Sequence, residues 1–395
     1  MLLDRYESKL IQSGLKMVMY VAVRKLFKCD VYYMHSLDKG LYCKIQSKNE
    51  LNLDDINKLK NMMDDLIKKD LKIIKKVITV KDAYNFYIKI NEIEKANNIL
   101  YSNNKTCTIY ELCGYYNYFL SDMPESTGKL NCYTLNYLGD NSVVLTTPYL
   151  SDYSLPEFNN QDMILKSFSD YKAWCNLVHV NYISDLNMLV SESKIKEFIK
   201  KNDIMMDNQI YELANLIRKE NKKLILLGGP SSSGKTTSTK KLALYMSAIG
   251  LNPIYLGLDD YFKEKVDSPK LENGEYDFES IDCIDLDLFN KQLTSILNGE
   301  AVSVPTYNFI EGKKEYKGRI IKLKENDIIL IEGLHCLNEK LTSTIPQEAK
   351  LKVYISPFMP LSVDRHNHIS TVDIRLLRRI VRDNRTRGYN VQDTL

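Results

Sequence analysis

The segment spanning residues 229–236 constrains the fold of this chain more than any other part of the sequence. It reads Gly-Pro-Ser-Ser-Ser-Gly-Lys-Thr and fits the phosphate-binding pattern Gly-x-x-x-x-Gly-Lys-Ser/Thr without a mismatch. Its glycines let consecutive backbone N–H groups turn inward around a phosphate, because no Cβ blocks the required dihedrals. An apolar run at Leu224–Leu227 precedes it, and a helical pattern at Thr237–Ala248 follows and stops at Gly250. We therefore expect a strand–loop–helix unit that binds a nucleoside triphosphate.

The residues of this loop have distinct expected roles. Lys235 would reach the outer phosphates of ATP and support catalysis, and the Thr236 hydroxyl would hold Mg²⁺. The residues expected to bind ATP are Gly229, Ser231, Ser232, Ser233, Gly234, Lys235, Thr236 and Thr237.

Composition excludes few classes of protein. A chain of 395 residues predicts two or three domains, and a net charge of +3 gives no strong electrostatic case for a nucleic-acid or membrane partner. The first residues lack the apolar core of a secretory signal, and the stretch Leu15–Phe27 is too short and too charged to span a bilayer. Eight scattered cysteines without paired metal-ligand spacing indicate reduced thiols. We expect a cytoplasmic protein without a membrane partner.

The sequence predicts three regions. Residues 1–150 have a mixed pattern of helical and strand-like segments, residues 151–221 form a helical connector, and residues 222–395 form the P-loop domain. Within the connector, Ser191–Lys201 and Asn208–Arg218 read as two helices, and no Gly or Pro occurs from residue 191 to residue 223.

Strand and helix patterns alternate after residue 222. Further strands are expected at Pro253–Leu258, Ile328–Ile331 and Leu351–Ile355, and a helix at Asp285–Leu297. This alternation predicts an α/β fold with a parallel sheet covered by helices on both faces, in three layers.

Carboxylates follow two of these strands, at the sheet edge where α/β proteins bind ligands. Asp259 is the candidate general base of a kinase acting on a hydroxyl, although it could be a turn or cap residue, a role open also to Asp260. Glu332 would hold Mg²⁺ or its water, or would cap a helix beginning near Leu334.

Four arginines form a stripe near the end of the chain. Arg375, Arg378, Arg379 and Arg382 recur at helical spacing, with Leu376, Leu377, Ile380 and Val381 on the opposite side. The pattern fits a solvated basic face, but a phosphoryl-transfer site needs cations beyond lysine and Mg²⁺. We therefore expect a packed, amphipathic lid helix in which Arg375 and Arg378 support catalysis and Arg379 and Arg382 bind ATP.

GTPases and the larger P-loop ATPases fit this sequence poorly. The GTPase patterns Asp-x-x-Gly and Asn-Lys-x-Asp do not occur after Thr236, and motor and ABC-type ATPases usually need a longer domain. A small-molecule kinase is the best remaining class.

Five motifs of the second half resemble the uridine kinase and phosphoribulokinase family. They are Gly229–Thr236, Leu258–Phe262, Tyr276–Glu279, Pro305–Phe309 and Arg375–Gly388. The resemblance implies that Asp259 deprotonates a nucleoside 5′-hydroxyl, that Glu279 holds ribose hydroxyls, and that the arginines belong to the lid. It also implies that Phe262 and Tyr307 line the nucleoside pocket.

The chain departs from this family at two points. The family commonly carries a pyrimidine-reading histidine where this chain has Gly312, so the resemblance leaves uridine and cytidine open as substrates. The family also continues through more helix and at least one further strand beyond the position of Leu395, so the kinase domain is expected to be incomplete at its C-terminus.

The segment Tyr6–Pro148 resembles, more distantly, the second additional (editing-like) domain of threonyl-tRNA synthetases. The resemblance rests on Gly40-Leu41-Tyr42 and on Cys113-Gly114 before Pro124–Gly128. It places Gln12, Lys16 and Asn117 where that domain has histidine ligands and leaves only Cys113, so we expect no Zn²⁺ site and a structural or regulatory role. For His35 and Cys43 we expect buried packing.

Two functions follow as hypotheses. The first is ATP- and Mg²⁺-dependent 5′-phosphorylation of a nucleoside, uridine above all, by a protein that could form a homo-oligomer. The second is a nucleotide-responsive RNA-binding protein, in which the front domain engages tRNA-like structures and the P-loop domain gates it.

Overall fold

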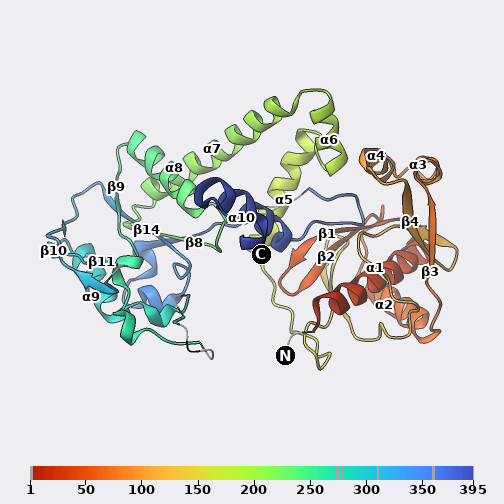
Figure 1. Ribbon diagram of the computed structural model, residues 1–395, viewed down its shortest axis with the longest axis horizontal. Coiled ribbons are helices and arrows are strands. Elements are labelled where there is room, and N and C mark those ends of the chain that lie inside the picture. Colours follow the sequence, from red (N-terminus) through yellow and green to blue (C-terminus); the bar gives the residue numbers. More distant parts are fainter. Residues whose placement is uncertain are drawn as a thin grey trace. The chain divides into compact units, whose positions relative to one another are not determined.

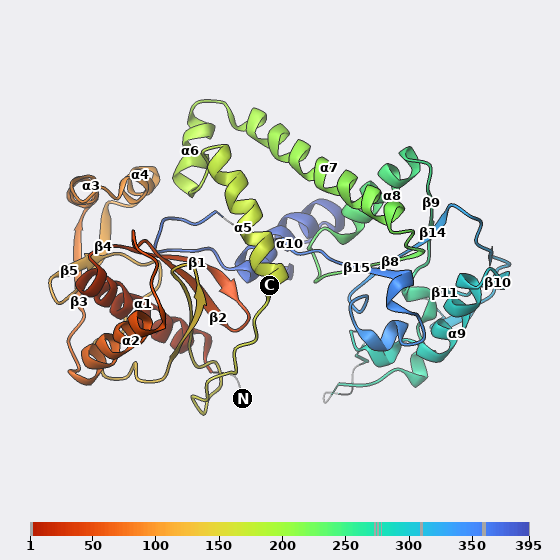
Figure 2. The same cartoon turned by 180° about the vertical axis from the view of Figure 1, so that it is seen from behind.

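The computed structural model describes residues 3–271, 274, 276–277, 279–308, 311–357 and 361–394. The chain forms two compact units. Unit 1 comprises Met1–Lys196 and Phe358–Ile374, and unit 2 comprises Glu197–Pro357 and Arg375–Leu395. The three regions expected from the sequence stay a prediction. Figures 1 and 2 show the elements of both units from opposite sides.

A four-stranded parallel sheet organises unit 2. Its strands, in spatial order, are β15 (Lys350–Tyr354), β8 (Leu224–Gly228), β14 (Asp327–Gly333) and β9 (Asn252–Tyr255). The central strands β8 and β14 are apolar runs buried on both faces, which is typical of parallel sheets between helices. The four strands expected from the sequence are therefore present.

Helices cover both faces of this sheet. On one face α7 (Ile195–Lys219) and α8 (Lys235–Ala248) pack on Ile225 and Ile328, and these two helices lie near each other in Figure 1. On the other face α9 (Leu286–Leu297) packs its Phe289 and Leu293 against Leu224 of β8. The predicted three-layer α/β/α fold is confirmed.

Two local expectations for unit 2 were wrong. The two helices expected in the connector are one continuous helix, α7, because the residues between them contain no Gly or Pro to end it. Strand β9 ends at Tyr255 rather than Leu258, and a 3₁₀ turn, η1 (Asp259–Tyr261), follows. Asp259 therefore lies in this turn and not directly at the strand end.

Short elements complete unit 2. Two small antiparallel pairs join β10 (Val302–Ser303) to β13 (Ile320–Ile321) and β11 (Thr306–Asn308) to β12 (Lys313–Glu315). The other 3₁₀ turns are η2 (Lys265–Asp267), η3 (Ile281–Cys283), η4 (Glu339–Thr342) and η5 (Gln347–Ala349), and the last helices are α10 (Thr371–Arg387) and α11 (Val391–Thr394).

Unit 1 is an α+β region, as expected. One antiparallel sheet has the order β1 (Val31–Leu37), β2 (Gly40–Ile45), β7 (Ser142–Thr146) and β6 (Thr134–Gly139). A second contains β3 (Ile74–Thr79), β4 (Thr106–Leu112) and β5 (Tyr115–Asn117). Its helices are α1 (Arg5–Phe27), α2 (Leu53–Lys68), α3 (Val80–Lys89), α4 (Ile93–Tyr101), α5 (Asp162–Leu177) and α6 (Ile183–Ser191).

Helix α1 forms the centre of the core of unit 1. Leu15, Val18 and Val21 are fully buried in one cluster with residues of α2 and of β1, β2 and β7. None of the helices in the described part of the chain has the length and apolar character needed to cross a membrane. The resemblance of this region to a tRNA synthetase domain stays a prediction.

The segment at residues 361–370, which comes between β15 and α10 in the chain, belongs to unit 1. The Tyr33 N–H donates to the Arg365 carbonyl at 2.9 Å. The Arg365 guanidinium binds both oxygens of Glu94, at 2.5 and 3.0 Å. The fully buried His366 places Nε2 2.9 Å from Oδ1 of Asp30. A network of buried charges therefore fixes this segment within unit 1.

Candidate active site

The loop between β8 and α8 has the curved backbone that its glycines predict. Gly234 has a φ of +99° and Ser232 a φ of +61°, which turns the chain sharply before the first residue of α8. A Cβ at Gly229 would collide with the carbonyl oxygen of Ile355 and lie 3.0 Å from Oγ of Ser233. Glycine at these positions lets the loop close into a cradle at the carboxyl end of the sheet.

Two hydroxyl groups in the cradle are buried without a partner. The Oγ atoms of Ser232 and Ser233 have no hydrogen-bond partner among the described residues. A buried polar group without a partner costs free energy, so these donors fit a ligand rich in acceptor oxygens, such as a phosphate chain. Ser231 and Thr237 lie on the exposed side of the same turn.

Lys235 is half-buried at the start of α8. Its ammonium donates to the Pro230 carbonyl at 3.0 Å, which folds the side chain back along the loop. Burial lowers the pKa of Lys235, and the positive charges of Arg375 and Arg382 act in the same direction, whereas Glu332 opposes them. An anionic ligand would relieve this crowding of cations.

Glu332 connects the tip of β14 to helix α8. Its two oxygens accept hydrogen bonds from Thr236 Oγ1 at 2.8 Å and from Thr239 Oγ1 at 3.1 Å. The alternative role of Glu332 as a cap is wrong, because residues 334–337 form a turn and not a helix. Thr239 was missed in the sequence, although it lies one turn after Thr236 on the same face of α8.

Asp259 and Asp260 have different surroundings. Asp260 accepts from the Tyr307 N–H at 3.3 Å and lies 3.8 Å from the Arg319 guanidinium, so it supports β11. The Asp259 carboxylate is exposed and has no hydrogen-bond partner among the described residues. Partial burial raises the pKa of Asp259, and the negative charges of Asp260 and Glu332 raise it further. An available carboxylate with a raised pKa has the properties of a general base.

The residues expected to bind a nucleoside fall into two groups. The rings of Phe262 and Tyr307 meet edge to face, with centroids 5.7 Å apart and an interplanar angle of 88°. Glu279 is exposed, and its carbonyl oxygen lies 2.8 Å from Nε2 of His335, in the turn after β14. Phe278 and Phe309, which belong to the motifs quoted above, lie outside the described residues.

Gly312 occupies a position that a larger residue would strain. Its φ is +67°, and a Cβ built on it would lie 2.9 Å from Cβ of Lys265. Its carbonyl oxygen accepts from the Lys265 N–H at 2.9 Å, which brings the two backbones close together. A histidine at this position would therefore require the backbone to move.

Helix α10 brings two of the four arginines to the loop. Arg378 Nε donates to the Ser232 carbonyl at 3.1 Å, and the buried Nε of Arg375 has no partner among the described residues. Arg379 and Arg382 instead pair with the buried Asp383, at 3.5 and 2.8 Å. Asp383 was not predicted from the sequence, although Asp at i+4 from Arg379 is a common helical ion-pair spacing.

The apolar side of α10 differs from the expectation of a packed helix. Leu377 is 59% exposed and Val381 is 50% exposed. The expectation was wrong because periodicity reports which residues share a face, but not whether another element covers that face.

The comparisons with known proteins agree with this geometry. A model of the phosphoribulokinase / uridine kinase family matches residues 224–395. A uridine kinase of Borrelia duttonii is 30% identical over 173 residues, which cover 44% of this chain and 73% of that protein. A uridine kinase of Staphylococcus haemolyticus is 28% identical over 175 residues, 44% of this chain and 75% of that protein.

A solved structure, described as that of a possible uridine kinase from Bacillus stearothermophilus, aligns with a TM-score of 0.28 and 19% identity, over 40% of this chain and 82% of that one. The family assignment rests on the family model and on the sequence relatives, of which the Borrelia duttonii protein is 30% identical and covered to 73% of its length. The chain is a kinase that belongs to the phosphoribulokinase / uridine kinase family.

Proposed function

We propose that this kinase transfers the γ-phosphoryl group of ATP to the 5′-hydroxyl of a nucleoside, and that uridine is its first substrate. The observation that carries the proposal is the Asp259 carboxylate, which has no hydrogen-bond partner among the described residues and whose pKa is raised by partial burial and by the charges of Asp260 and Glu332. A base of this kind suits an alcohol acceptor, which must lose its proton as it attacks phosphorus. The relatives named uridine kinase favour uridine among such alcohols.

The residues of the site have different roles in the proposed reaction. Asp259 accepts the proton of the 5′-hydroxyl while that oxygen forms a bond to the γ-phosphorus, and the bond between this phosphorus and the bridging oxygen breaks to release ADP. Lys235, Arg375 and Arg378 counter the negative charge on the transferring group. The hydroxyls of Ser232 and Ser233 and the backbone amides of the loop hold the phosphate chain.

A divalent cation fits the carboxyl end of the sheet. Thr236 and Glu332 carry the oxygen donors that Mg²⁺ prefers, and their mutual hydrogen bond holds both side chains in place. Held by Thr236 and Glu332, Mg²⁺ would supply positive charge that offsets the negative charge of the phosphates. The remaining loop residues orient the triphosphate through Gly229, Gly234 and the exposed Ser231 and Thr237.

The nucleoside is proposed to bind beside Phe262 and Tyr307, whose rings offer flat apolar surface to a base. Glu279 would accept hydrogen bonds from ribose hydroxyls. Because Gly312 offers no side chain to read the base, we propose that uridine and cytidine are both accepted.

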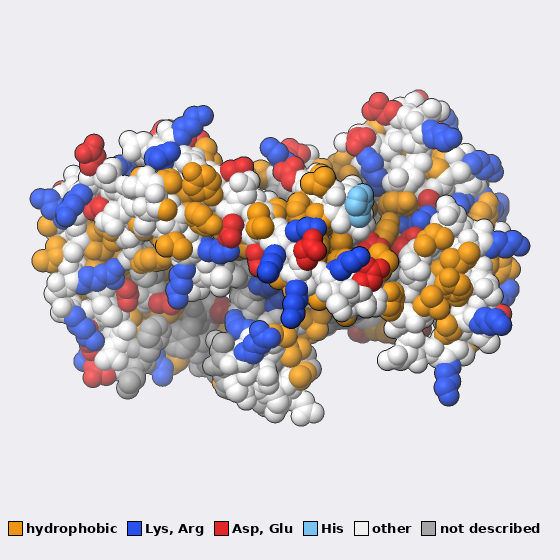
Figure 3. Space-filling view, turned by 90° about the horizontal axis from the view of Figure 1, so that it is seen from above, with side chains coloured by type: hydrophobic (Ala, Val, Ile, Leu, Met, Phe, Trp, Pro, Cys, Tyr) orange, Lys and Arg blue, Asp and Glu red, His pale blue; other side chains and the backbone are white. Residues whose placement is uncertain are grey.

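The RNA-binding alternative gains no support from the charge distribution. Phosphate contacts normally require a concentrated basic surface. On the face drawn in Figure 3, the basic and acidic side chains of the described residues are interspersed, with no large area of one sign. The net charge of +3 agrees with this distribution.

An acceptor-dependence assay tests the proposal. We expect ADP release from ATP and Mg²⁺ with uridine or cytidine, together with formation of the nucleoside 5′-monophosphate. Asp259→Asn should lower kcat by about 10²–10⁴-fold, the usual contribution of a general base. The matched control is Asp267→Asn. Asp267 is an exposed aspartate in η2, which lies between β9 and α9 as Asp259 does, and its loss of charge should leave kcat unchanged.

Two outcomes would contradict the proposal. Equal ADP release with and without a nucleoside would show an ATPase and not a nucleoside kinase. Retention of most of the turnover by Asp259→Asn would remove the proposed base.

A further inference from the structure

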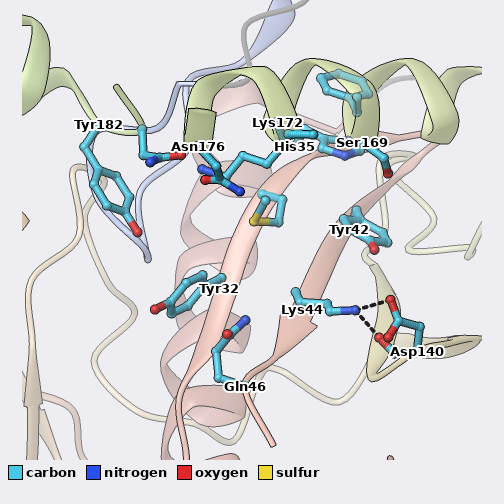
Figure 4. A pocket seen from close by; sticks show the side chains of 14 residues that line it. Tyr32, His35, Tyr42, Lys44, Gln46, Asp140, Ser169, Lys172, Asn176 and Tyr182 are labelled. Atoms are coloured by element: carbon cyan, nitrogen blue, oxygen red, sulfur yellow. Dashed lines mark hydrogen bonds and ion pairs between the residues drawn. The ribbon is translucent and has the colours of Figure 1, made fainter. Parts of the chain in front are cut away.

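Unit 1 contains a cavity of about 500 Å³ that none of the site residues above lines. Strands β1 and β2 form its floor, and helix α5 covers it (Figure 4). Tyr182 and Tyr32 lie at one end of the cavity, and Asp140 lies at the other. A volume of this size is typical of sites for small molecules.

Aromatic rings make up much of the cavity wall. His35 stacks on Phe168, with ring centroids 3.5 Å apart and an interplanar angle of 5°. It stacks also on Tyr42, at 5.0 Å and 15°. Burial lowers the pKa of His35 to about 4, so the imidazole is neutral at physiological pH and adds no charge. The expected buried packing of His35 is confirmed, since its ring is stacked with Phe168 and Tyr42. Together these rings give the cavity an apolar, aromatic wall against which a planar ligand can pack.

The cavity contains one cation without a carboxylate partner. Lys44 is bound to the side chain and carbonyl of Asp140, which leaves its charge compensated. Lys172 of α5 has no ion-pair or hydrogen-bond partner among the described residues, and its ammonium lies 5.6 Å from the ring centre of Tyr182. Burial lowers the pKa of Lys172, which is the signature of a cation placed in a poorly solvated position.

Amide groups are also left open at the cavity. Asn181 Oδ1 is buried without a partner among the described residues. The side chains of Gln46 and Asn176 line the cavity and make no side-chain hydrogen bond in the described part of the chain. Amides carry both donors and acceptors, and so they match the edge of a nucleobase.

We propose that this cavity binds a nucleoside monophosphate, with the base against the aromatic wall, the base edge on the amides and the phosphate at Lys172. A single uncompensated cation suits the charge of a monophosphate and falls short of that of a triphosphate. An uncharged nucleoside would leave Lys172 without an acceptor. The proposal is independent of the proposed reaction, because every lining residue belongs to unit 1 and the P-loop belongs to unit 2.

Binding of UMP to the full-length protein tests this site. Equilibrium dialysis with labelled UMP counts bound equivalents, and Trp174 of α5, the sole tryptophan of the chain, reports locally by fluorescence. We expect Lys172→Met to raise the dissociation constant of this site about ten-fold or more, as expected for loss of a charge-assisted contact. Lys166→Met removes an exposed lysine of the same helix that does not line the cavity, and it should bind UMP as the wild type does.

A further variant and two further ligands identify the chemistry that the cavity recognises. Asn176→Leu, at an exposed position on α5, should also weaken UMP binding and serves if Lys172→Met does not fold. Followed by Trp174 fluorescence, which reports on this cavity and not on the kinase site of unit 2, uridine should bind at least about ten-fold more weakly than UMP, and benzoate should not displace UMP. UMP binding that is identical in Lys172→Met, Asn176→Leu and Lys166→Met would overturn the proposal. Equal competition by benzoate would overturn the nucleotide assignment, because the cavity would then recognise any aromatic anion.

Discussion

Asp259 and Asp260 are adjacent and chemically identical, yet they have separate roles in the structure. Asp260 is bound to the backbone of Tyr307, whereas the Asp259 carboxylate is available to a ligand. At the scale of single residues, the site therefore depends on which carboxylate is already engaged. Glu332 is likewise an engaged carboxylate, because it accepts hydrogen bonds from Thr236 and Thr239 of α8.

The raised pKa of Asp259 predicts a shifted pH profile. As a general base Asp259 must be ionised, so kcat/KM for the nucleoside should fall as the pH drops through its pKa. Because partial burial, Asp260 and Glu332 raise this pKa, the acidic limb should lie above the ordinary aspartate value of about 3.9. Asp260→Asn removes one negative neighbour, lowers the pKa of Asp259 and should move the limb to lower pH.

The comparison is a pH–rate profile of the wild type, Asp260→Asn and Asp267→Asn. Asparagine retains an oxygen to accept from the Tyr307 N–H, so the local fold should persist. Asp267→Asn should leave the limb in place. An unmoved limb in Asp260→Asn would show that Asp259 is not the titrating group.

At the scale of elements, helix α10 supplies cations to the loop before α8. Arg378 donates a hydrogen bond to the Ser232 carbonyl, and the buried Nε of Arg375 has no partner among the described residues. Arg379 and Arg382 form ion pairs with Asp383. The four arginines thus form two pairs with different tasks. We expect Arg375 and Arg378 to be available to a phosphate, whereas Arg379 and Arg382 are paired with Asp383 on the same helix.

Removal of the loop-facing pair should impair chemistry more than binding. We expect the double variant Arg375→Ala/Arg378→Ala to lower kcat by about 10³-fold, with a smaller change in KM for the nucleoside, because arginines act mainly on transition-state charge. Arg385→Ala, an exposed arginine on the same helix, is the control and should keep the wild-type kcat. Steady-state kinetics measure both variants. An equal loss of kcat in Arg375→Ala/Arg378→Ala and in Arg385→Ala would contradict this role.

At the scale of the whole molecule, the chain returns to unit 1 after the last strand of the parallel sheet. Arg365 and His366 bind Glu94 and Asp30, residues more than 250 positions earlier in the sequence. Burial alone would raise the pKa of Asp30, but His366 and Arg24 outweigh it and hold that pKa well below its usual range. This stabilisation is present above the unfolded-state pKa of about 3.9 and is lost as the pH falls below it.

Loss of Arg365 should destabilise unit 1. Arg365→Ala leaves Glu94 without its bidentate partner in a buried position, which costs about 3–5 kcal/mol. Lys58→Ala, which breaks an exposed pair with Asp55, should leave the free energy of unfolding nearly unchanged. Urea unfolding followed by Trp174 fluorescence measures both. An unchanged midpoint for Arg365→Ala would show that the network contributes nothing to stability.

Local patterns determined much of the kinase unit from sequence alone. The phosphate loop, the four strands and the helices α8 and α9 follow from residue spacing, because glycine positions and apolar periodicity act on the backbone within a few residues. Asp259 and Glu332 were predicted because each comes directly after an apolar run, and Lys235 was predicted because it completes the glycine-rich phosphate-binding pattern.

Only the tertiary structure decided which of these side chains meet. The bonds of Glu332 to Thr239, of Asp260 to Tyr307 and of Arg365 to Glu94 join residues 93, 47 and 271 positions apart. Sequence spacing carries no information about such distances, because they depend on how packed elements bring remote side chains together. The cavity under α5 has the same origin: its walls come from strands and a helix that no single sequence window contains.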